Sequence, residues 1–212
     1  MKLSSFVVLA VAACAGALST AQAQEAAGKA QAAAFDKRMF AGPLGAKSLA
    51  CFVRRYDANH LAQHPKQKVS AMKLLVEAKT VPQDKTINYS FRVGIQYRDR
   101  PGNFDSGGYC NHALPTKAGR VTAYECGVDC EGGGLTVALS NDNKSATARI
   151  GRIMVSDRSK PDAEPAEMQT DGSDDKVFRV DRAEASECAE LVTDRNSPPS
   201  ATSDRLQVMG LK

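Results

Sequence analysis

Five cysteines that follow the N-terminal apolar segment offer the clearest chemistry in this sequence. They are Cys51, Cys110, Cys126, Cys130 and Cys188. In an oxidising compartment, five cysteines are expected to form two disulfides and to leave one thiol. Spacing alone does not select the pairs, so the connectivity is open at this point.

Two sets of pairs fit the sequence. Joining Cys51 to Cys188 would close a long loop and restrain the unfolded chain. Cys126 and Cys130 are separated by three residues and can join across a turn, which leaves Cys110 as the odd cysteine. The alternative pairs Cys110 with Cys126 or with Cys130 across adjacent strands.

A zinc site is the metal-binding alternative. Cys110, His112, Cys126 and Cys130 supply three sulfurs and one imidazole, which is a permissible tetrahedral set. Their spacing matches no common zinc finger or ribbon, and oxidation competes with metal loading outside the cytosol. We therefore predict structural disulfides and no metal or other cofactor, with zinc as the alternative.

A second metal-like group is Asp57, His60 and His64. On a helix these side chains share one face, and two imidazoles with a carboxylate can bind a metal. The segment lacks the glutamate of the protease motif His-Glu-x-x-His, and Pro65 shortens any helix. We expect a single helical turn with Asp57 as its N-cap and exposed imidazoles.

No other segment predicts catalysis. The chain has no Gly-x-Ser-x-Gly elbow, and Ser106 is expected in a turn. The Asp174–Asp175 pair is expected in a solvated turn rather than as an acid–base pair. Gly132–Gly134 lacks the Lys-Ser or Lys-Thr of a phosphate loop and precedes a strand, so it predicts a bulged hairpin. We therefore assign no catalytic residue.

The first 23 residues have the features of a secretory signal peptide. Lys2 gives a positive start, Phe6–Leu18 is apolar and uncharged, and Ala21–Ala23 matches the small-x-small cleavage rule. Export to the periplasm or the outside follows. The alternative is a lipid anchor at Cys14, because the residues before it loosely resemble a lipoprotein box. No later segment is long and apolar enough to cross a bilayer.

Alternating hydrophobicity predicts a β fold. Apolar residues occupy every second position from Ile87 to Tyr97, with polar residues between them. A second alternating face runs from Met72 to Ala78. Val121–Cys126 and Leu135–Leu139 are expected to form a hairpin, and Ala146–Val155 a strand with a bulge near Gly151.

These elements predict an all-β domain over residues 49–192. The expected fold is a single antiparallel β-barrel or sandwich of calycin-like size with one short C-terminal helix. That helix, within Arg182–Val192, is expected to bury Ala185, Cys188, Ala189 and Val192. Residues 24–48 are expected to be a flexible leader, 157–175 a mobile loop and 193–212 a disordered tail.

Charge gives a weaker signal. The formal net charge of +4 is too small to predict nucleic-acid binding. Residues 36–120 hold 15 basic and 6 acidic residues, whereas residues 121–212 hold 11 basic and 17 acidic residues. This asymmetry would fit an anion-binding face, but the two halves of one β domain can interleave and neutralise each other.

One resemblance adds to these patterns. Three segments of the chain resemble an uncharacterised family of bacterial exported proteins. They are Tyr56-Asp57 with His60-Leu61 and His64-Pro65, the Cys-Gly-x-x-Cys-x-Gly-Gly hairpin at Cys126, and Phe178-Arg179-Val180-Asp181 before Cys188. The resemblance spans about Leu49 to Val192 and implies no activity. We therefore expect a non-enzymatic exported protein that binds a small molecule, an envelope component or a partner protein. A metal-binding protein or metal-dependent enzyme is the alternative.

Overall fold

A computed structural model of the chain describes residues 25–113, 122–129, 131–168 and 175–192. The expected signal peptide, Cys14, Cys130, Asp174 and the tail after residue 192 lie outside this part. Within it the chain forms an N-terminal helix over residues 25–39 and three shorter helical segments, α2 (Ala58–Gln63), the 3₁₀ helix η2 (Ala185–Cys188) and α3 (Ala189–Val192). The strands are β1 (Lys47–Arg55), β2 (Val69–Val81), β3 (Thr86–Tyr97), β4 (Phe104–His112), β5 (Ala123–Gly127), β6 (Gly133–Leu139), β7 (Ser145–Asp157), β8 (Ala166–Glu167) and β9 (Val177–Ala183).

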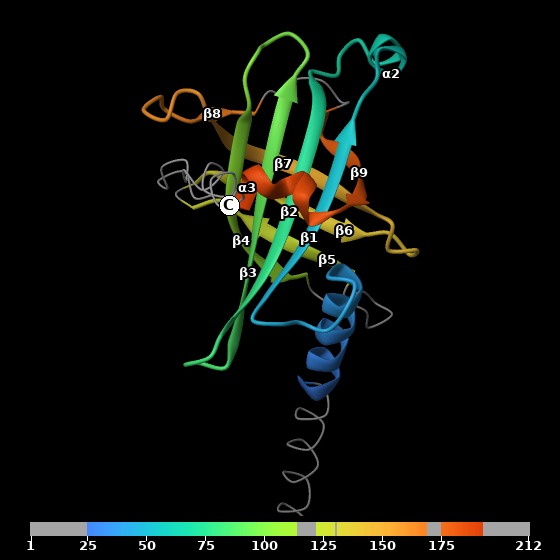
Figure 1. Ribbon diagram of the computed structural model, residues 1–212, viewed down its shortest axis with the longest axis vertical. Coiled ribbons are helices and arrows are strands. Elements are labelled where there is room, and N and C mark those ends of the chain that lie inside the picture. Colours follow the sequence, from blue (N-terminus) through green and yellow to red (C-terminus); the bar gives the residue numbers. More distant parts are fainter. Residues whose placement is uncertain (1–24, 114–121, 130, 169–174, 193–212) are drawn as a thin grey trace, which may run out of the picture.

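Eight of these strands pair into a closed antiparallel ring. The order is β1–β2–β3–β4–β5–β6–β7–β9, and β9 pairs with β1 to complete it. Strand β8 adds to β7 outside the ring. The predicted antiparallel all-β fold is therefore confirmed, and it takes the barrel-like rather than the sandwich form (Figure 1).

The inward side of the ring is filled by side chains. Met72, Leu74 and Val76 on β2 are fully buried, as the alternating pattern predicts. On β3 the same pattern buries Phe91 to Tyr97, but Ile87 at the start of the strand is 39% exposed. Because packed aromatic and aliphatic groups occupy the centre, the grooves described below lie outside it.

The predicted bulge in β7 is confirmed. Gly133 pairs with Ile153 while Leu135 pairs with Ile150, so β7 carries one extra residue around Gly151. Gly133 has φ +82°, and a Cβ there would lie 1.7 Å from the Arg152 carbonyl oxygen. Only glycine fits this close backbone approach, which explains part of the glycine run without a phosphate loop.

Two disulfides hold the ring. Cys51 on β1 bonds Cys188 of η2, as predicted. Cys110 on β4 bonds Cys126 on β5, which is the cross-strand alternative. The Cys126–Cys130 pair and the assignment of Cys110 as the odd cysteine are wrong, because Cys110 and Cys126 face each other directly in the β4–β5 register.

The C-terminal helix was expected to bury a different face. Cys188 and Leu191 are buried against Cys51, Val53 and Leu75 on the outer side of the ring, whereas Ala185, Ala189 and Val192 are exposed. The reason is that the segment starts as a 3₁₀ turn, which changes the rotation between residues. The preceding loop also holds more structure than expected, because β8 forms and Met168 is buried.

The flexible leader and the single helix are the main errors of the sequence prediction. Residues 25–39 form a helix whose Phe35, Asp36 and Met39 are buried, and β1 begins at Lys47. Figure 1 shows this helix and α2 at opposite ends of the long axis of the molecule. No helix in the described ranges is long and apolar enough to traverse a bilayer.

The two disulfides should differ in their contribution to stability. They span sequence separations of 137 and 16 residues. Loop-closure entropy predicts that the free energy of unfolding falls by about 5 kcal/mol in the double variant Cys51→Ala with Cys188→Ala. It predicts a fall of about 3 kcal/mol in the double variant Cys110→Ala with Cys126→Ala. Urea unfolding of both double variants measures this order. A larger loss for the Cys110–Cys126 pair would contradict the entropic account.

Candidate functional site

The N-terminal helix inserts one carboxylate among the strands. Asp36 is 4% exposed. Its Oδ1 accepts hydrogen bonds from Tyr124 Oη at 2.5 Å and from His112 Nε2 at 2.7 Å, and its Oδ2 accepts one from Tyr89 Oη at 2.7 Å. Because a carboxylate ion only accepts, Nε2 of His112 must carry the proton.

Strand register brings the three donors together. His112 lies directly opposite Tyr124 in the β4–β5 ladder, and Tyr89 lies opposite Cys110 in the β3–β4 ladder. The Cys110–Cys126 disulfide lies two residues further along the β4–β5 ladder and fixes the register between these two strands. The ladders and the disulfide thus place the three donors where the Asp36 carboxylate can accept from all of them.

The cluster favours the ionised form of Asp36. Burial alone would raise the pKa of Asp36, but the hydrogen bonds from His112, Tyr124 and Tyr89 outweigh it and lower the pKa below its usual value. Burial and the Asp36 charge raise the pKa of Tyr89 and of Tyr124, so both phenols stay protonated and keep donating. The four side chains therefore form one stable hydrogen-bonded unit.

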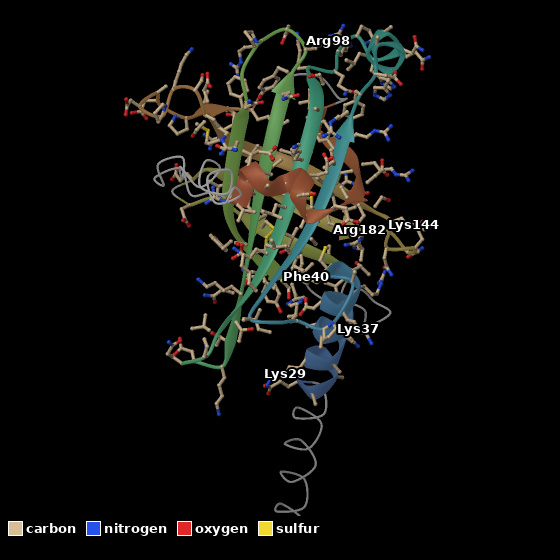
Figure 2. All side chains as sticks on the ribbon, viewed as in Figure 1. Lys29, Lys37, Phe40, Arg98, Lys144 and Arg182 are labelled. Atoms are coloured by element: carbon tan, nitrogen blue, oxygen red, sulfur yellow. A yellow bond between two sulfur atoms is a disulfide. The ribbon has the colours of Figure 1, made fainter. Side chains whose placement is uncertain are left out.

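The end of the helix is held by a second, half-buried charge. Arg182 on β9 donates to the carbonyl oxygens of Arg38 and Met39 and of Asn143. Figure 2 shows Arg182 above the C-terminal end of the helix, which carries Lys29 and Lys37. A cation at this position satisfies carbonyl groups that the helix itself leaves without partners. Burial lowers the pKa of Arg182.

A surface groove opens beside this cluster because two strands separate. The β3–β4 register ends at Tyr89 opposite Cys110, after which β4 follows β5 to His112. Strand β3 continues along β2 to Thr86. The resulting opening, called the β3–β4 groove below, has a volume of about 500 Å³ and is lined by Ile87, Asn88, Tyr89, Ser90, Gly108, Tyr109, Cys110, Asn111, His112 and Asp129.

The lining of the β3–β4 groove combines an exposed aromatic ring with hydrogen-bonding groups. Tyr109 is 53% exposed, the highest value among the large hydrophobic side chains described as exposed. Asn88, Ser90 and Asn111 add amide and hydroxyl groups. His112 and Tyr89 link the groove to Asp36, so the buried carboxylate positions two of the side chains that line it.

The predicted zinc set is not formed. Cys110 and Cys126 bond to each other, so neither sulfur is a thiolate ligand, and His112 Nε2 binds Asp36. Across residues 25–113, 122–129, 131–168 and 175–192 no group of three or more His, Cys, Asp or Glu side chains is arranged to hold a metal ion.

The Asp57–His60–His64 group folds as the predicted capped turn, but His60 and His64 are half-buried rather than exposed as expected. Asp57 Oδ1 accepts from the His60 amide at 2.8 Å, and α2 ends before Pro65. The imidazoles do not converge on a common point. Instead they stack, with ring centroids 4.6 Å apart for Tyr56 and His60 and 4.3 Å apart for His60 and His64. The structure therefore gives this group a ring stack rather than a metal site.

The remaining acidic and serine candidates lie elsewhere than expected. Ser106 is buried within β4 opposite Val93, not in a turn. It is six residues from His112 on the same strand, about 20 Å away at the usual strand rise. Asp175 is 0% exposed and accepts from the amides of Lys68 and Val69, so the prediction of a solvated turn is wrong for it.

Sequence reasoning missed Asp36, Tyr89, Tyr124 and Tyr109 as site residues. The signal that was available is Phe35 with Met39, an apolar i, i+4 pair within residues 24–48, the range in which a flexible leader is expected. That pair indicates a docked helix and so a reason for the intervening Asp36 to be buried. No local pattern indicates its three partners, which come from three different strands.

The chain matches no protein-family model, no curated protein and no solved structure. The function must therefore be argued from the geometry of its own side chains.

Asp36→Asn should alter how stability depends on pH. The pKa of Asp36 is lower in the folded than in the unfolded protein, so the ionised carboxylate stabilises the fold. This stabilisation is fully present above the pKa of an unfolded Asp, about 3.9, and is lost as pH falls through the lower pKa of the folded state. We expect Asp36→Asn to lower the free energy of unfolding by about 1–3 kcal/mol at pH 7. The difference in this free energy between the variant and wild type should become smaller towards pH 3.

Urea unfolding between pH 3 and pH 7 measures this gap. Asp84→Asn, which changes an exposed turn carboxylate, is the control and should follow wild type throughout. A constant difference between Asp36→Asn and wild type over the whole pH range would contradict an ionised Asp36.

Proposed function

We propose that this protein is an exported binding protein, and that the β3–β4 groove recognises a neutral saccharide segment of the cell envelope. The signal-like N-terminus supports export, and the two disulfides fit an oxidising periplasmic or extracellular compartment. The resemblance to bacterial exported proteins supports the same location.

The exposed ring of Tyr109 in a groove that two asparagine side chains also line is the observation that carries the proposal. A sugar ring has an apolar C–H face and a rim of hydroxyl groups. The apolar face packs on an aromatic ring, and each hydroxyl needs both a donor and an acceptor. Asn88 and Asn111 offer both on one side chain, and Ile87, 39% exposed, extends the apolar surface.

The charge of the lining favours a neutral ligand. Asp129 is the one carboxylate among the ten residues that line the β3–β4 groove, and no lysine or arginine is among them. A strongly anionic ligand would meet this carboxylate without a guanidinium to pair with. The volume of about 500 Å³ is within the range of small-molecule sites.

The chemistry of the groove supports binding rather than catalysis. His112 already uses Nε2 to hold Asp36, and Tyr89 donates its hydroxyl hydrogen to the same carboxylate. Both groups are thereby fixed in orientation, which suits recognition because little side-chain freedom is lost on binding. Saccharide recognition needs no reactive nucleophile, only fixed polar groups and an exposed ring.

Binding of N-acetylglucosamine oligomers to the mature protein, followed by calorimetry, tests the proposal. Tyr109→Ala should weaken binding by about tenfold, or about 1.4 kcal/mol, because the stacking surface is lost. Tyr109→Phe keeps the ring and should bind within about twofold of wild type.

Val177→Ala is the matched control, because it removes an exposed apolar side chain that does not line this groove. It should leave the affinity unchanged. Equal binding by wild type and Tyr109→Ala, with unchanged thermal stability, would show that the β3–β4 groove is not the saccharide site.

A further inference from the structure

A second groove lies at the other end of the molecule, beside α2, and is independent of the proposed saccharide site. It has a volume of about 320 Å³. Figure 1 places α2 at the end opposite to the N-terminal helix. We call it the arginine–histidine groove, and its lining is Arg54, Tyr56, His60, His64, Gln67, Val177 and Arg179.

The local sequence builds one wall of this groove as a column of flat groups. The Arg54 guanidinium lies 5.4 Å from the Tyr56 ring centroid, and Tyr56, His60 and His64 continue the column by stacking. Asp57 caps α2 and so sets the direction of both imidazoles. Burial raises the pKa of Tyr56, against the opposing effect of Arg54, which keeps this ring neutral.

Buried groups fix the tautomer of His60. The side-chain amide nitrogen of Gln67 donates to the Val69 carbonyl oxygen at 2.7 Å. Its Oε1 is therefore the atom that faces His60 Nε2 at 3.0 Å, and Nε2 must be the donor. Asp175 holds this segment by accepting from the amides of Lys68 and Val69. The imidazole and its support are thus preorganised.

The lining of the groove carries two arginines, while the carboxylates that act on its Tyr56 ring, Asp175 and Asp181, are not part of that lining. None of its seven lining residues is acidic. Asp181 on β9 serves both arginines, with Oδ2 at 3.0 Å from Arg54 Nη1 and Oδ1 at 3.4 Å from Arg179 Nε. One carboxylate therefore neutralises two guanidinium groups, each of which has five N–H donors. The side chains of Arg54 and Arg179 are 40% and 71% exposed, so further donors can reach a ligand.

From this arrangement we propose that the arginine–histidine groove binds a phosphate group, carried either by a small molecule or by a lipid headgroup. Guanidinium groups hold such anions with paired, charge-assisted hydrogen bonds. Val177, 43% exposed at the same groove, offers an apolar contact to the organic part of the ligand.

Titration of the mature protein with pyrophosphate, followed by calorimetry, is the first test. Arg54→Gln and Arg179→Gln should each weaken binding by about tenfold, and the double variant should lose it. Arg152→Gln removes an exposed arginine that pairs with Glu167 outside the groove, and it should bind within about twofold of wild type.

Asp181→Asn distinguishes a binding role of the arginines from a structural one. It removes the carboxylate that competes for both guanidinium groups, so pyrophosphate affinity should rise by about threefold or more. If the arginines only formed a structural ion-pair network, this change would not raise the affinity for pyrophosphate. Weaker binding by Asp181→Asn than by wild type, or wild-type affinity in either arginine variant, would overturn the proposal.

Vesicles separate the two sources of the anion. Phosphatidylglycerol vesicles, compared with phosphatidylcholine vesicles, test for a lipid headgroup, and pyrophosphate tests for a free anion. Binding to either anion that is lost in the double arginine variant supports the site and assigns its source. Absence of binding to both probes at low salt would refute it. Neither result bears on saccharide binding, because Tyr109 and its groove are unchanged.

Discussion

The closure of the strand ring is the constraint on which the rest of this structure depends. Each of the eight strands must find a partner on both sides, so β9 has to return between β7 and β1 although it comes last in the chain. The Cys51–Cys188 disulfide lies just after this return and holds the outer face of β1 to η2. A ring closed in this way leaves few free strand edges that could pair with other chains.

The same constraint creates the two grooves. Strand β4 cannot follow both β3 and β5 over its whole length, so it leaves β3 at Tyr89 and opens the β3–β4 groove. At the other end, the connection from β1 to β2 makes the capped turn α2 and stacks His60 against Tyr56. Both grooves therefore lie where the regular ladder ends, while packed side chains fill the interior of the ring.

A buried carboxylate and a half-buried guanidinium join the N-terminal helix to the ring. Asp36 meets three donors from three strands, and Arg182 meets the carbonyl groups at the helix end. A buried charge is tolerated only when its partners are complete, so these contacts specify where the helix lies more than they add to stability. Phe35 and Met39 supply the apolar burial on either side of Asp36.

The sequence by itself determined the features that depend on neighbouring residues. The alternation from Ile87 to Tyr97, the Asp57 cap and the bulge near Gly151 are local, because the period of the side chains and the preferences of turn residues decide them. They were enough to predict an antiparallel all-β fold. The Cys51–Cys188 pair was among the pairs that fit the sequence, but spacing alone did not select it.

Only the tertiary structure decided the features that depend on register between distant strands. The choice of Cys126 as the partner of Cys110 depends on which residues of β4 and β5 face each other. The burial of Asp36 depends on Tyr89 and Tyr124, which are 53 and 88 residues away. A one-residue slip in either ladder would turn these side chains to the opposite face, and no local pattern encodes that offset.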